Sequence, residues 1–516
     1  MKQLYNLLFI ITFLFSNYMI SQPNISWERS LGGTSGEIAF SVKQTTDGGY
    51  IVAGYSLSGG GEVNGNNGGR DIWVVKLDAN GTIVWENNYG GSAHDEAHNI
   101  EQTTDGGYIL IGSSNSDDFA GVDNYNDFDD IVILKLDNLG QMQWGKFYGT
   151  STTDNGYAIK QTTDGGYIAT GYVGLGSHYD AWAAKLDASG NIDSNWATTI
   201  FGGPDYGTST TPRFYSDGFY SVDVATDGYV VCGFTQREGD SGSPQNDYWI
   251  LKFAFDGSIV WEAILGGDAS EEAKSIVTTN DGGCIIAGYT RSDGITGGGR
   301  LRDYWIVKLD SDGDLDWDIA YGGSQNDEAA SIDQTSDNGY IVLGFSRSND
   351  GDISGSIIPN SEKDYWLVKL TEDGNLDWEK SLGGYGDDDG FCVTQTTDGG
   401  YILAGTTTSS NIDIDPDDRS GASDYWVVKL EAETLGYESF EFNEEVIIYP
   451  NPSNGIINIR THLEITDLQL YDSLGKRVLE NRISNNQLDV SGISAGIYYL
   501  KVLTESKQVL KKLIIN

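Results

Sequence analysis

Short apolar runs alternate with Gly- and Asp-rich turns along most of the chain. One set of four runs reads EAHNIEQT, GYILIG, DIVILKLD and QMQWGKFYG. The runs are rich in Val, Ile, Tyr and Trp, which favour strands. Several runs are apolar at consecutive positions, as expected for strands that are covered on both faces by neighbouring sheets. No segment shows a helical period, so the pattern predicts an all-β protein.

The four-strand pattern recurs along the chain. The phrase QTTDGGYI occurs unchanged at residues 44–51, 102–109, 161–168 and 395–402, and looser copies lie between them. Alignment on this phrase gives seven units at intervals of 55 to 62 residues. Repeated four-stranded sheets of this size predict a seven-bladed β-propeller over residues 22–440. The aligned positions are Tyr50, Tyr108, Tyr167, Tyr229, Cys284, Tyr340 and Tyr401.

The two ends of the repeat region complement each other. The seventh unit stops after DYWVVKLE and lacks the following strand that carries Trp and Gly-Gly, while ISWERSLGG precedes the first unit as a lone copy of that strand. Pairing of the two would close the ring and remove exposed sheet edges. We therefore expect Trp27 to lie in the same sheet as Trp426.

The repeated turn DxxGxxxW suggests a wider family. It reads LDANGTIVW, LDNLGQMQW and LDSDGDLDW. This turn resembles the tryptophan-docking repeat of the quinoprotein alcohol dehydrogenase-like propellers, and the resemblance covers most of residues 22–440. The resemblance implies the architecture only. The cofactor site of the true dehydrogenases uses adjacent cysteines, and no two of Cys232, Cys284 and Cys392 are adjacent. Because they lie in apolar stretches, we expect buried free thiols.

The first 21 residues have the features of a secretory signal peptide. Lys2 supplies the positive charge, residues 4–15 form the apolar segment, and small residues follow near Ser21. The apolar run is too short to span a bilayer stably, and no comparable run follows it. We expect an exported, soluble, monomeric protein without a transmembrane segment.

The composition changes after ESFEFNEEV, and residues 441–516 form a separate segment. Alternating strands and turns there predict a small immunoglobulin-like β-sandwich. Its motifs YPNPSNG and GIYYL, with the end KKLIIN, resemble the type A C-terminal sorting domain of Bacteroidota type IX secretion. The resemblance implies passage through the periplasm, contact with the type IX machinery, and release or attachment at the outer cell surface. The matching positions are Pro450, Asn451, Pro452, Gly455, Asp472, Gly475, Gly496, Tyr498 and Lys512.

The charge is strongly acidic and unevenly distributed. The chain carries −45, and residues 22–445 hold 22 basic and 70 acidic residues, a net charge of −48. Such a field repels nucleic acid and anionic lipid and attracts cations. Excess surface acid can equally serve solubility alone.

Residues that recur once in every unit are best explained by architecture. An Asp before Gly-Gly is typical of a tight turn, and a buried Lys without a carboxylate partner would be costly. We therefore expect both columns to be structural. The columns are Asp47, Asp105, Asp164, Asp227, Asp281, Asp337 and Asp398, and Lys76, Lys135, Lys185, Lys252, Lys308, Lys369 and Lys429.

Specificity is expected on the rim that varies between units. The loops between the second and third strands differ in every unit, and variable loops on a rigid scaffold commonly bind ligands. The segment GGPDYGTSTTPRFYSDGFY departs most from the repeat. The candidate ligand-binding residues are Asp205, Tyr206, Arg213, Phe214 and Tyr215.

Carboxylates at the start of the innermost strands, together with the acidic loop NDGDISG, suggest Ca²⁺, which prefers oxygen ligands. Solvated acidic loops are the alternative. The stretch HDEAH from His94 to His98 is not a zinc motif, because residues four apart on a strand lie about 13 Å from each other. The candidate metal ligands are Asp95, Glu96, Asp327, Glu328, Asp350, Asp352, Asp387 and Asp388.

Two functional hypotheses remain. The first is a non-enzymatic, secreted or surface-held propeller that binds an extracellular ligand, such as a glycan, on its acidic variable face, with Ca²⁺ as a candidate cofactor. The second is a secreted, endoglucanase-like glycan hydrolase, which would use two of the many rim carboxylates. Abundance makes that signal nonspecific, and no catalytic residue is assigned.

Overall fold

The computed structural model describes residues 20–123, 128–196, 200–202, 215–238, 244–296, 301–354, 362–409, 422–435, 446–453, 455–461, 465–472, 476–481, 487–504 and 508–516. The chain forms two compact units: one spans Ile20–Glu433, and the other contains Thr434–Asn516. The boundary expected at residues 440 and 441 falls outside the described residues, as does most of the predicted signal peptide.

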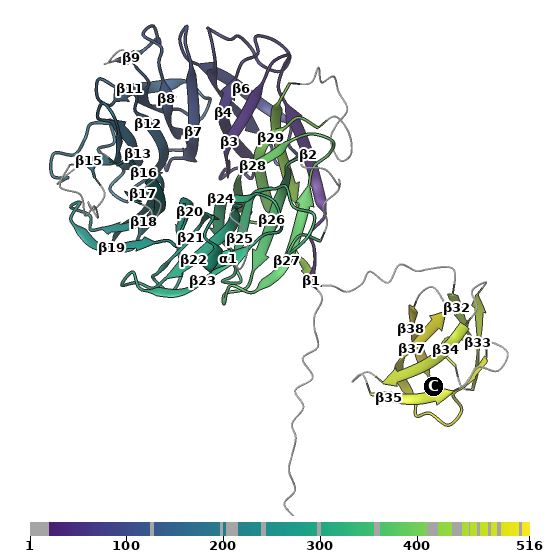
Figure 1. The fold of residues 1–516 in the computed structure, drawn as a ribbon. Coiled ribbons are helices and arrows are strands. Elements are labelled where there is room, and N and C mark those ends of the chain that lie inside the picture. Colours follow the sequence, from purple (N-terminus) through teal and green to yellow (C-terminus); the bar gives the residue numbers. More distant parts are fainter. Residues whose placement is uncertain are drawn as a thin grey trace, which may run out of the picture. The chain divides into compact units, whose positions relative to one another are not determined.

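The first unit is a ring of seven antiparallel sheets with four main strands each (Figure 1). Each sheet runs in chain order from the central channel outward, apart from the last, which ends on β2. The strands are β3 (Glu37–Gln44), β4 (Tyr50–Ser56), β5 (Asp71–Leu77) and β6 (Ile83–Tyr89); β7 (Asp95–Gln102), β8 (Tyr108–Ser114), β10 (Asp130–Leu136) and β11 (Met142–Tyr148); β12 (Asn155–Gln161), β13 (Tyr167–Gly174), β14 (Tyr179–Leu186) and β15 (Ile200–Phe201); β16 (Asp217–Ala225), β17 (Gly228–Glu238), β18 (Pro244–Phe253) and β19 (Ile259–Leu265); β20 (Glu272–Thr278), β21 (Cys284–Thr290), β22 (Asp303–Leu309) and β23 (Leu315–Tyr321); β24 (Asp327–Gln334), β25 (Tyr340–Ser346), β26 (Asp364–Leu370) and β27 (Leu376–Leu382); and β28 (Asp388–Gln395), β29 (Tyr401–Thr407), β30 (Asp424–Leu430) and β2 (Ile25–Leu31).

The N-terminal strand closes the ring as the sequence predicts. Strand β2 pairs antiparallel with β30, so that Ser30 lies opposite Trp426 and Trp27 opposite Lys429. The innermost strands β28 and β3 lie side by side, and the Thr397 amide donates to the Gln44 side chain at 2.8 Å. The all-β, seven-bladed propeller closed by its first strand is therefore confirmed.

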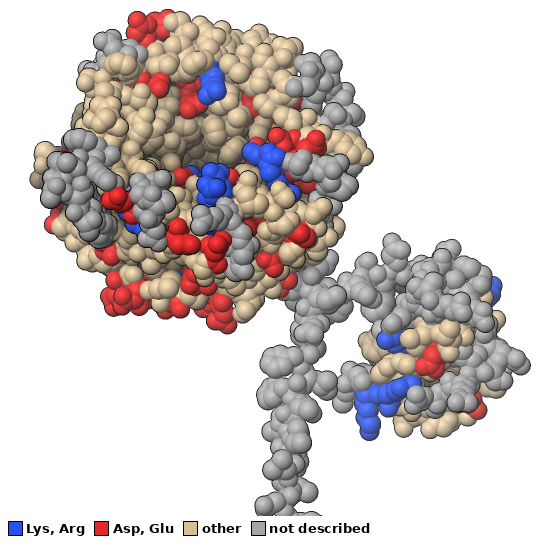
Figure 2. All heavy atoms as spheres, viewed as in Figure 1, with Lys and Arg blue, Asp and Glu red and all other residues tan. Residues whose placement is uncertain are grey.

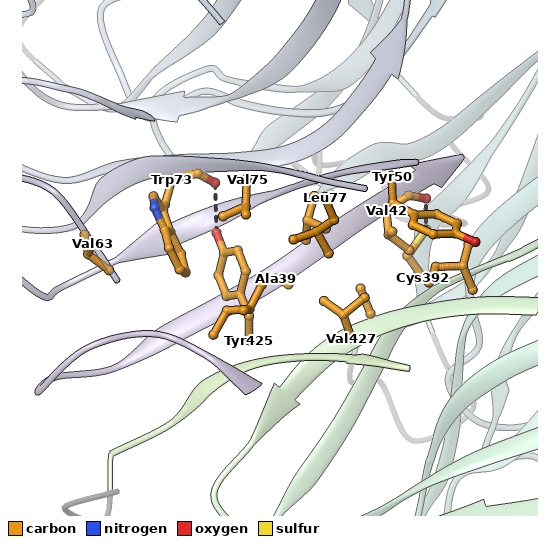
Figure 3. Packing of buried hydrophobic residues seen from close by; sticks show 14 residues of the cluster. Ala39, Val42, Tyr50, Val63, Trp73, Val75, Leu77, Cys392, Tyr425 and Val427 are labelled. Carbon is orange, nitrogen blue, oxygen red and sulfur yellow. Dashed lines mark hydrogen bonds between the residues drawn. The ribbon is translucent and has the colours of Figure 1, made fainter. Parts of the chain in front are cut away.

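The blades are held together by apolar side chains between adjacent sheets. Every residue of β4 and β5 is buried, in agreement with their unbroken apolar sequences. Figure 3 shows the cluster between the last and first blades, where the Tyr425 ring packs on Trp73 and its hydroxyl donates to the Trp73 carbonyl at 2.9 Å. Burial of such large aromatic faces is a main source of stability at each junction.

The repeated phrase is structural. Its Asp accepts hydrogen bonds from the Thr two residues before it and from a turn amide, as Asp47 does from Thr45 and Gly49. The same Asp pairs with the buried Lys of the third strand in all seven blades. This confirms the expectation for both columns. The N–O distances are 2.8 to 3.0 Å for Lys76–Asp47, Lys135–Asp105, Lys185–Asp164, Lys252–Asp227, Lys308–Asp281, Lys369–Asp337 and Lys429–Asp398.

Tryptophans on the outer strands dock on the next blade. Trp27 donates from Nε1 to the Ala79 carbonyl at 3.1 Å, and its ring covers Gly81. Gly81 has φ +77°, and a Cβ there would lie 2.7 Å from the ring, so the turn requires glycine on both grounds. Docking of this kind explains the DxxGxxxW pattern without assigning a family.

The smaller elements of the chain are β1 (Ile20–Ser21), β9 (Val122–Asp123), β31 (Thr434–Leu435) and the one-turn helix α1 (Asp293–Thr296). In the C-terminal unit two sheets share one apolar core, in keeping with the predicted small sandwich. One sheet contains β32 (Val446–Tyr449), β33 (Ile456–Thr461) and β36 (Gln487–Asp489); the other contains β35 (Arg477–Asn481), β34 (Ile465–Asp472), β37 (Gly496–Thr504) and β38 (Gln508–Ile515).

Candidate functional site

Each innermost strand carries a β-bulge at the same position. The pairing register with the second strand shifts by one residue there, and a bulge redirects the extra side chain. In this ring, the extra residue lines the central channel. The bulge residues, in blade order, are Phe40, His98, Tyr157, Tyr220, Lys274, Ala330 and Phe391.

The bulge residues form an aromatic collar, defined here as Phe391, Phe40, His98, Tyr157 and Tyr220. Neighbouring ring centroids are 4.9 to 5.2 Å apart from one blade to the next. Lys274 continues the series, with Nζ 4.0 Å from the centre of the Tyr220 ring. Ala330 has no large side chain, so the collar has a gap at the sixth blade.

The mouth of the channel lies on the variable-loop side of the collar. Four acids stand two residues before a bulge residue, and each pairs with a basic side chain. The pairs are Arg70–Glu96 at 3.1 Å, Lys274–Glu272 at 2.5 Å, Lys363–Asp389 at 2.8 Å and Arg302–Glu328. Figure 2 shows blue Lys and Arg side chains beside the central hollow, while red acidic side chains are spread over the outer surface.

Paired charges shift the pKa values at this mouth. Burial would raise the pKa of Glu96, but His98 and Arg70 outweigh it and lower the pKa to about 2. His98 is held at both ring nitrogens, by Glu96 at 3.3 Å and by the Gly156 carbonyl at 2.8 Å. With its pKa this low, Glu96 stays ionised near neutral pH and is not suited to donate a proton to a substrate.

A second set of residues lines the channel three positions after the bulge, and we call it the charged level. It consists of Lys43, Glu101, Lys160, Asp223, Val277, Asp333 and Thr394, one from each blade. Between the collar and the charged level lies a cavity of about 320 Å³, lined by all seven innermost strands. This volume is at the lower end of the range for small-molecule sites.

The first acid of each innermost strand lies away from the channel, at the junction with the preceding blade. Asp95 is fully buried and accepts from Gly91 N at 2.9 Å and Ser116 Oγ at 2.8 Å. Asp327 has the equivalent bonds, from Gly323 N and Ser348. These carboxylates hold the variable-loop links in place.

In six of the seven blades a second carboxylate faces this acid across a glycine. Asp303 and Asp327 both lie next to Gly322, and a Cβ there would be 2.4 and 2.9 Å from their oxygens. Burial, followed by the charges of Asp327 and Asp352, raises the pKa of Asp303 to about 7. Burial likewise raises the pKa of Asp388 to about 6.

The remaining candidate metal ligands are engaged in loop contacts. Asp350 accepts from Ser324 N at 2.8 Å, Asp352 from Gly322 N at 3.1 Å, and Asp387 from Lys363 N at 2.9 Å. Glu328 pairs with Arg302. In the part of the chain that the structure describes, no three His, Cys, Asp or Glu side chains are grouped so as to hold a metal ion.

Of the candidate ligand-binding residues, Asp205, Tyr206, Arg213 and Phe214 lie outside the described residues. Tyr215 is described, and its buried hydroxyl has no hydrogen-bond partner among the described residues. The aromatic collar was not predicted from the sequence. An alignment of the innermost strands could have indicated it, because the bulge position varies between blades while the neighbouring strand positions vary less.

The predicted sorting residues cluster around the last strand. Asn451 donates to the Lys512 carbonyl at 2.7 Å and accepts from Ile514 N at 2.9 Å, which ties YPNPSNG to β38. The Tyr498 hydroxyl donates to the Ser494 carbonyl at 2.8 Å. Gly496 opens β37 and Asp472 ends β34, whereas Gly475 is outside the described residues. The Gly455 amide donates to Ser453 Oγ at 3.3 Å, within the loop that holds Pro450 and Pro452.

Comparison with known proteins identifies the C-terminal unit. Residues 447–516 match the family described as secretion system C-terminal sorting domain. Over 165 residues the chain is 28% identical to the regulatory protein FlaEY of Caulobacter vibrioides, a match that covers 30% of this chain and 17% of that protein.

Similar solved structures include propellers. Sqt1 of Chaetomium thermophilum, bound to the N-terminus of ribosomal protein L10, has a TM-score of 0.42 at 12% identity and covers 80% of this chain and 100% of that one. Puromycin hydrolase has a TM-score of 0.43 at 12% identity, with 94% and 62% covered. The WD40 domain of Neurospora crassa Pan2 has a TM-score of 0.30 at 11% identity, with 60% and 86% covered. At these scores the likenesses carry no argument about function.

Within the described ranges no helix is both long and apolar enough to cross a membrane. The chain thus joins a seven-bladed propeller to a type IX sorting domain, which directs it to the cell surface or the extracellular space.

Proposed function

We propose that this exported propeller is a non-enzymatic binding protein that holds a carbohydrate ligand at the channel mouth on its variable-loop face. The observation that carries the proposal is the aromatic collar directly beneath a ring of paired charges. Aromatic side chains give large apolar contact area while leaving a polar edge for hydrogen bonds. Sugars present such a combination of apolar ring faces and hydroxyl groups.

The mouth supplies polar partners without a strong net charge. Arg70 and Glu96, and likewise Lys363 and Asp389, provide fixed donors and acceptors next to the collar. A few convergent polar groups around an apolar floor are typical of small-molecule sites. The resemblance of the DxxGxxxW turn to that of quinoprotein-type propellers enters the proposal only as architecture.

A glycan array with the full chain tests the proposal. We expect retention of specific glycans and about tenfold weaker binding by Tyr157→Ala, because aromatic residues at the centre of a site commonly dominate affinity. The matched control is Phe255→Ala, a half-exposed aromatic on a turn of the opposite rim. Absence of any retained glycan, or equal loss in both variants, would contradict the proposal.

The same experiment also tests whether Ca²⁺ is needed for binding and whether the protein hydrolyses glycans. Ca²⁺ binding to the acidic loops around Asp350 and Asp352 stays a prediction, and the array is run with Ca²⁺ and with a chelator. A reducing-sugar assay on every retained glycan addresses hydrolysis. Release of reducing ends by the wild-type chain would favour the hydrolase.

A further inference from the structure

The charged level of the channel is not electrically balanced. Of its seven residues two are cationic, Lys43 and Lys160, while Glu101, Asp223 and Asp333 are carboxylates. Glu101 lies 3.5 Å from Lys43 and 3.1 Å from Lys160, and Asp223 lies 3.8 Å from Lys160. These three contacts use both ammonium groups. The third carboxylate of this level, that of Asp333, therefore has no ammonium group of the described residues within ion-pair distance.

Asp333 is the carboxylate without a close cation. It accepts a hydrogen bond from the Gln395 backbone amide at 3.0 Å, and no ion pair within 4.0 Å of it occurs among the described residues. The neighbouring blades contribute the uncharged Val277 and Thr394 to this level. Burial raises the pKa of Asp333 by more than Lys43 lowers it. A partly buried carboxylate in this position is costly unless a cation joins it.

The gap in the collar lies on the same strand as this carboxylate. Ala330 is the bulge residue of β24, and Asp333 stands three residues further into the channel. On the other blades the bulge positions hold the five aromatic rings of the collar and, beside them, Lys274. The position of Lys274 over Tyr220 shows that the collar already accommodates an ammonium group. An elongated ligand that enters by the mouth therefore has an open course past Ala330 to Asp333.

We propose that the channel binds a primary alkylammonium ion, with its ammonium group on Asp333 and its alkyl chain against the collar. The cavity of about 320 Å³ has room for such a chain. The net charge of −48 on residues 22–445 raises the local concentration of cations. The inference rests on the proposed function in one respect, namely that a ligand enters through the mouth described there.

Titration of the full chain with pentylammonium chloride, followed by calorimetry and by the melting temperature, tests the site. We expect saturable binding that raises the melting temperature, because a ligand that binds only the folded state stabilises it. Neutral 1-pentanol and ammonium chloride are the matched ligands. Each lacks one half of the interaction, so both should bind more weakly than pentylammonium. Equal binding of 1-pentanol, or no binding of pentylammonium, would overturn the proposal.

Two substitutions test the charge of Asp333 and the access past Ala330 separately. Asp333→Asn keeps the shape and the acceptor for Gln395, and should weaken pentylammonium binding by about tenfold to a hundredfold, the loss expected for a hydrogen bond to a charged group. Ala330→Phe should close the gap and abolish binding while Asp333 remains. Binding by Asp333→Asn within twofold of wild type refutes the assignment. If that variant does not fold, Ala330→Phe and the comparison of ligands still decide.

The two proposals fail separately. Loss of glycan retention with intact pentylammonium binding would leave the channel site standing and refute the function proposed at the mouth. Glycan retention without pentylammonium binding would refute this site alone.

Discussion

Replacement of Asp337 by Ala provides the sharpest test of the structural role of the repeated phrase. Its carboxylate accepts from Lys369 Nζ at 2.9 Å, from Gly339 N at 3.0 Å and from Thr335 Oγ1. The Lys369 side chain is only 1% exposed, whereas that of Asp337 is 55% exposed. The substitution leaves a buried ammonium group whose remaining hydrogen-bond partner among the described residues is the Leu370 carbonyl, at 3.1 Å.

The size of the effect follows from these contacts. Hydrogen bonds to a charged group contribute about 1.5–3 kcal/mol each, but water can reach the exposed side of this carboxylate and replace part of them. We expect Asp337→Ala to lower the free energy of unfolding by about 2–3 kcal/mol. In a Lys369→Met background the same change should cost about 1 kcal/mol, because no buried ammonium group is then left unpaired.

Urea denaturation of the four chains of this double-mutant cycle measures both values. The exposed neighbour Asp373 provides the matched control, and Asp373→Ala should change the free energy of unfolding by less than about 0.5 kcal/mol. Additive effects of Asp337→Ala and Lys369→Met would show that the pair does not act as a unit. The repeated Asp and Lys would then need another explanation.

Three further outcomes are expected. Asp303→Asn should flatten the fall in melting temperature between about pH 4 and pH 7. Burial raises the pKa of Asp303 from its ordinary value of 3.8 to about 7, so the folded state holds the proton more tightly and loses stability as the pH rises through this interval. Trp27→Ala should lower the free energy of unfolding by about 2–3 kcal/mol in urea, since the half-buried ring packs on Tyr50 and Gly81. A chain truncated after residue 445 should stay inside the cell instead of reaching the surface or medium, as cell fractionation would show.

The frame of the propeller is readable from the sequence because it depends on local patterns that repeat. The Asp-Gly-Gly turns, the doubly buried strands and the Trp and Gly of the docking turn each recur with nearly fixed spacing. The incomplete seventh unit and the lone N-terminal strand predict closure, and β2 on β30 confirms it. The same holds for the sorting domain, whose motifs lie in one short segment.

The channel could not be predicted in this way, because the bulge changes which residues face it. In a regular strand, alternation would place residues 38, 40 and 42 on one face. The register shift after Ala39 instead lets Phe40 line the channel together with Ser41 and Lys43, while Val42 enters the core. Acids that look equivalent in the sequence are separated likewise: Asp95 is buried at a blade junction, and Glu96 pairs at the mouth.

The bulge also explains why specificity can develop at the channel of so regular a ring. The core position two residues after the bulge is always Val or Ile, because the adjacent sheets leave space for little else. The bulge position itself holds Phe, His, Tyr, Lys or Ala. A side chain that extends into an open channel meets no packing requirement of the sheet interiors, so its identity can change in one blade without disturbing the strands of the others. The blades therefore differ most at the positions where the fold constrains the side chain least, and a ligand site needs such differences. Ala330, the one small residue among large bulge residues, is the largest of these differences.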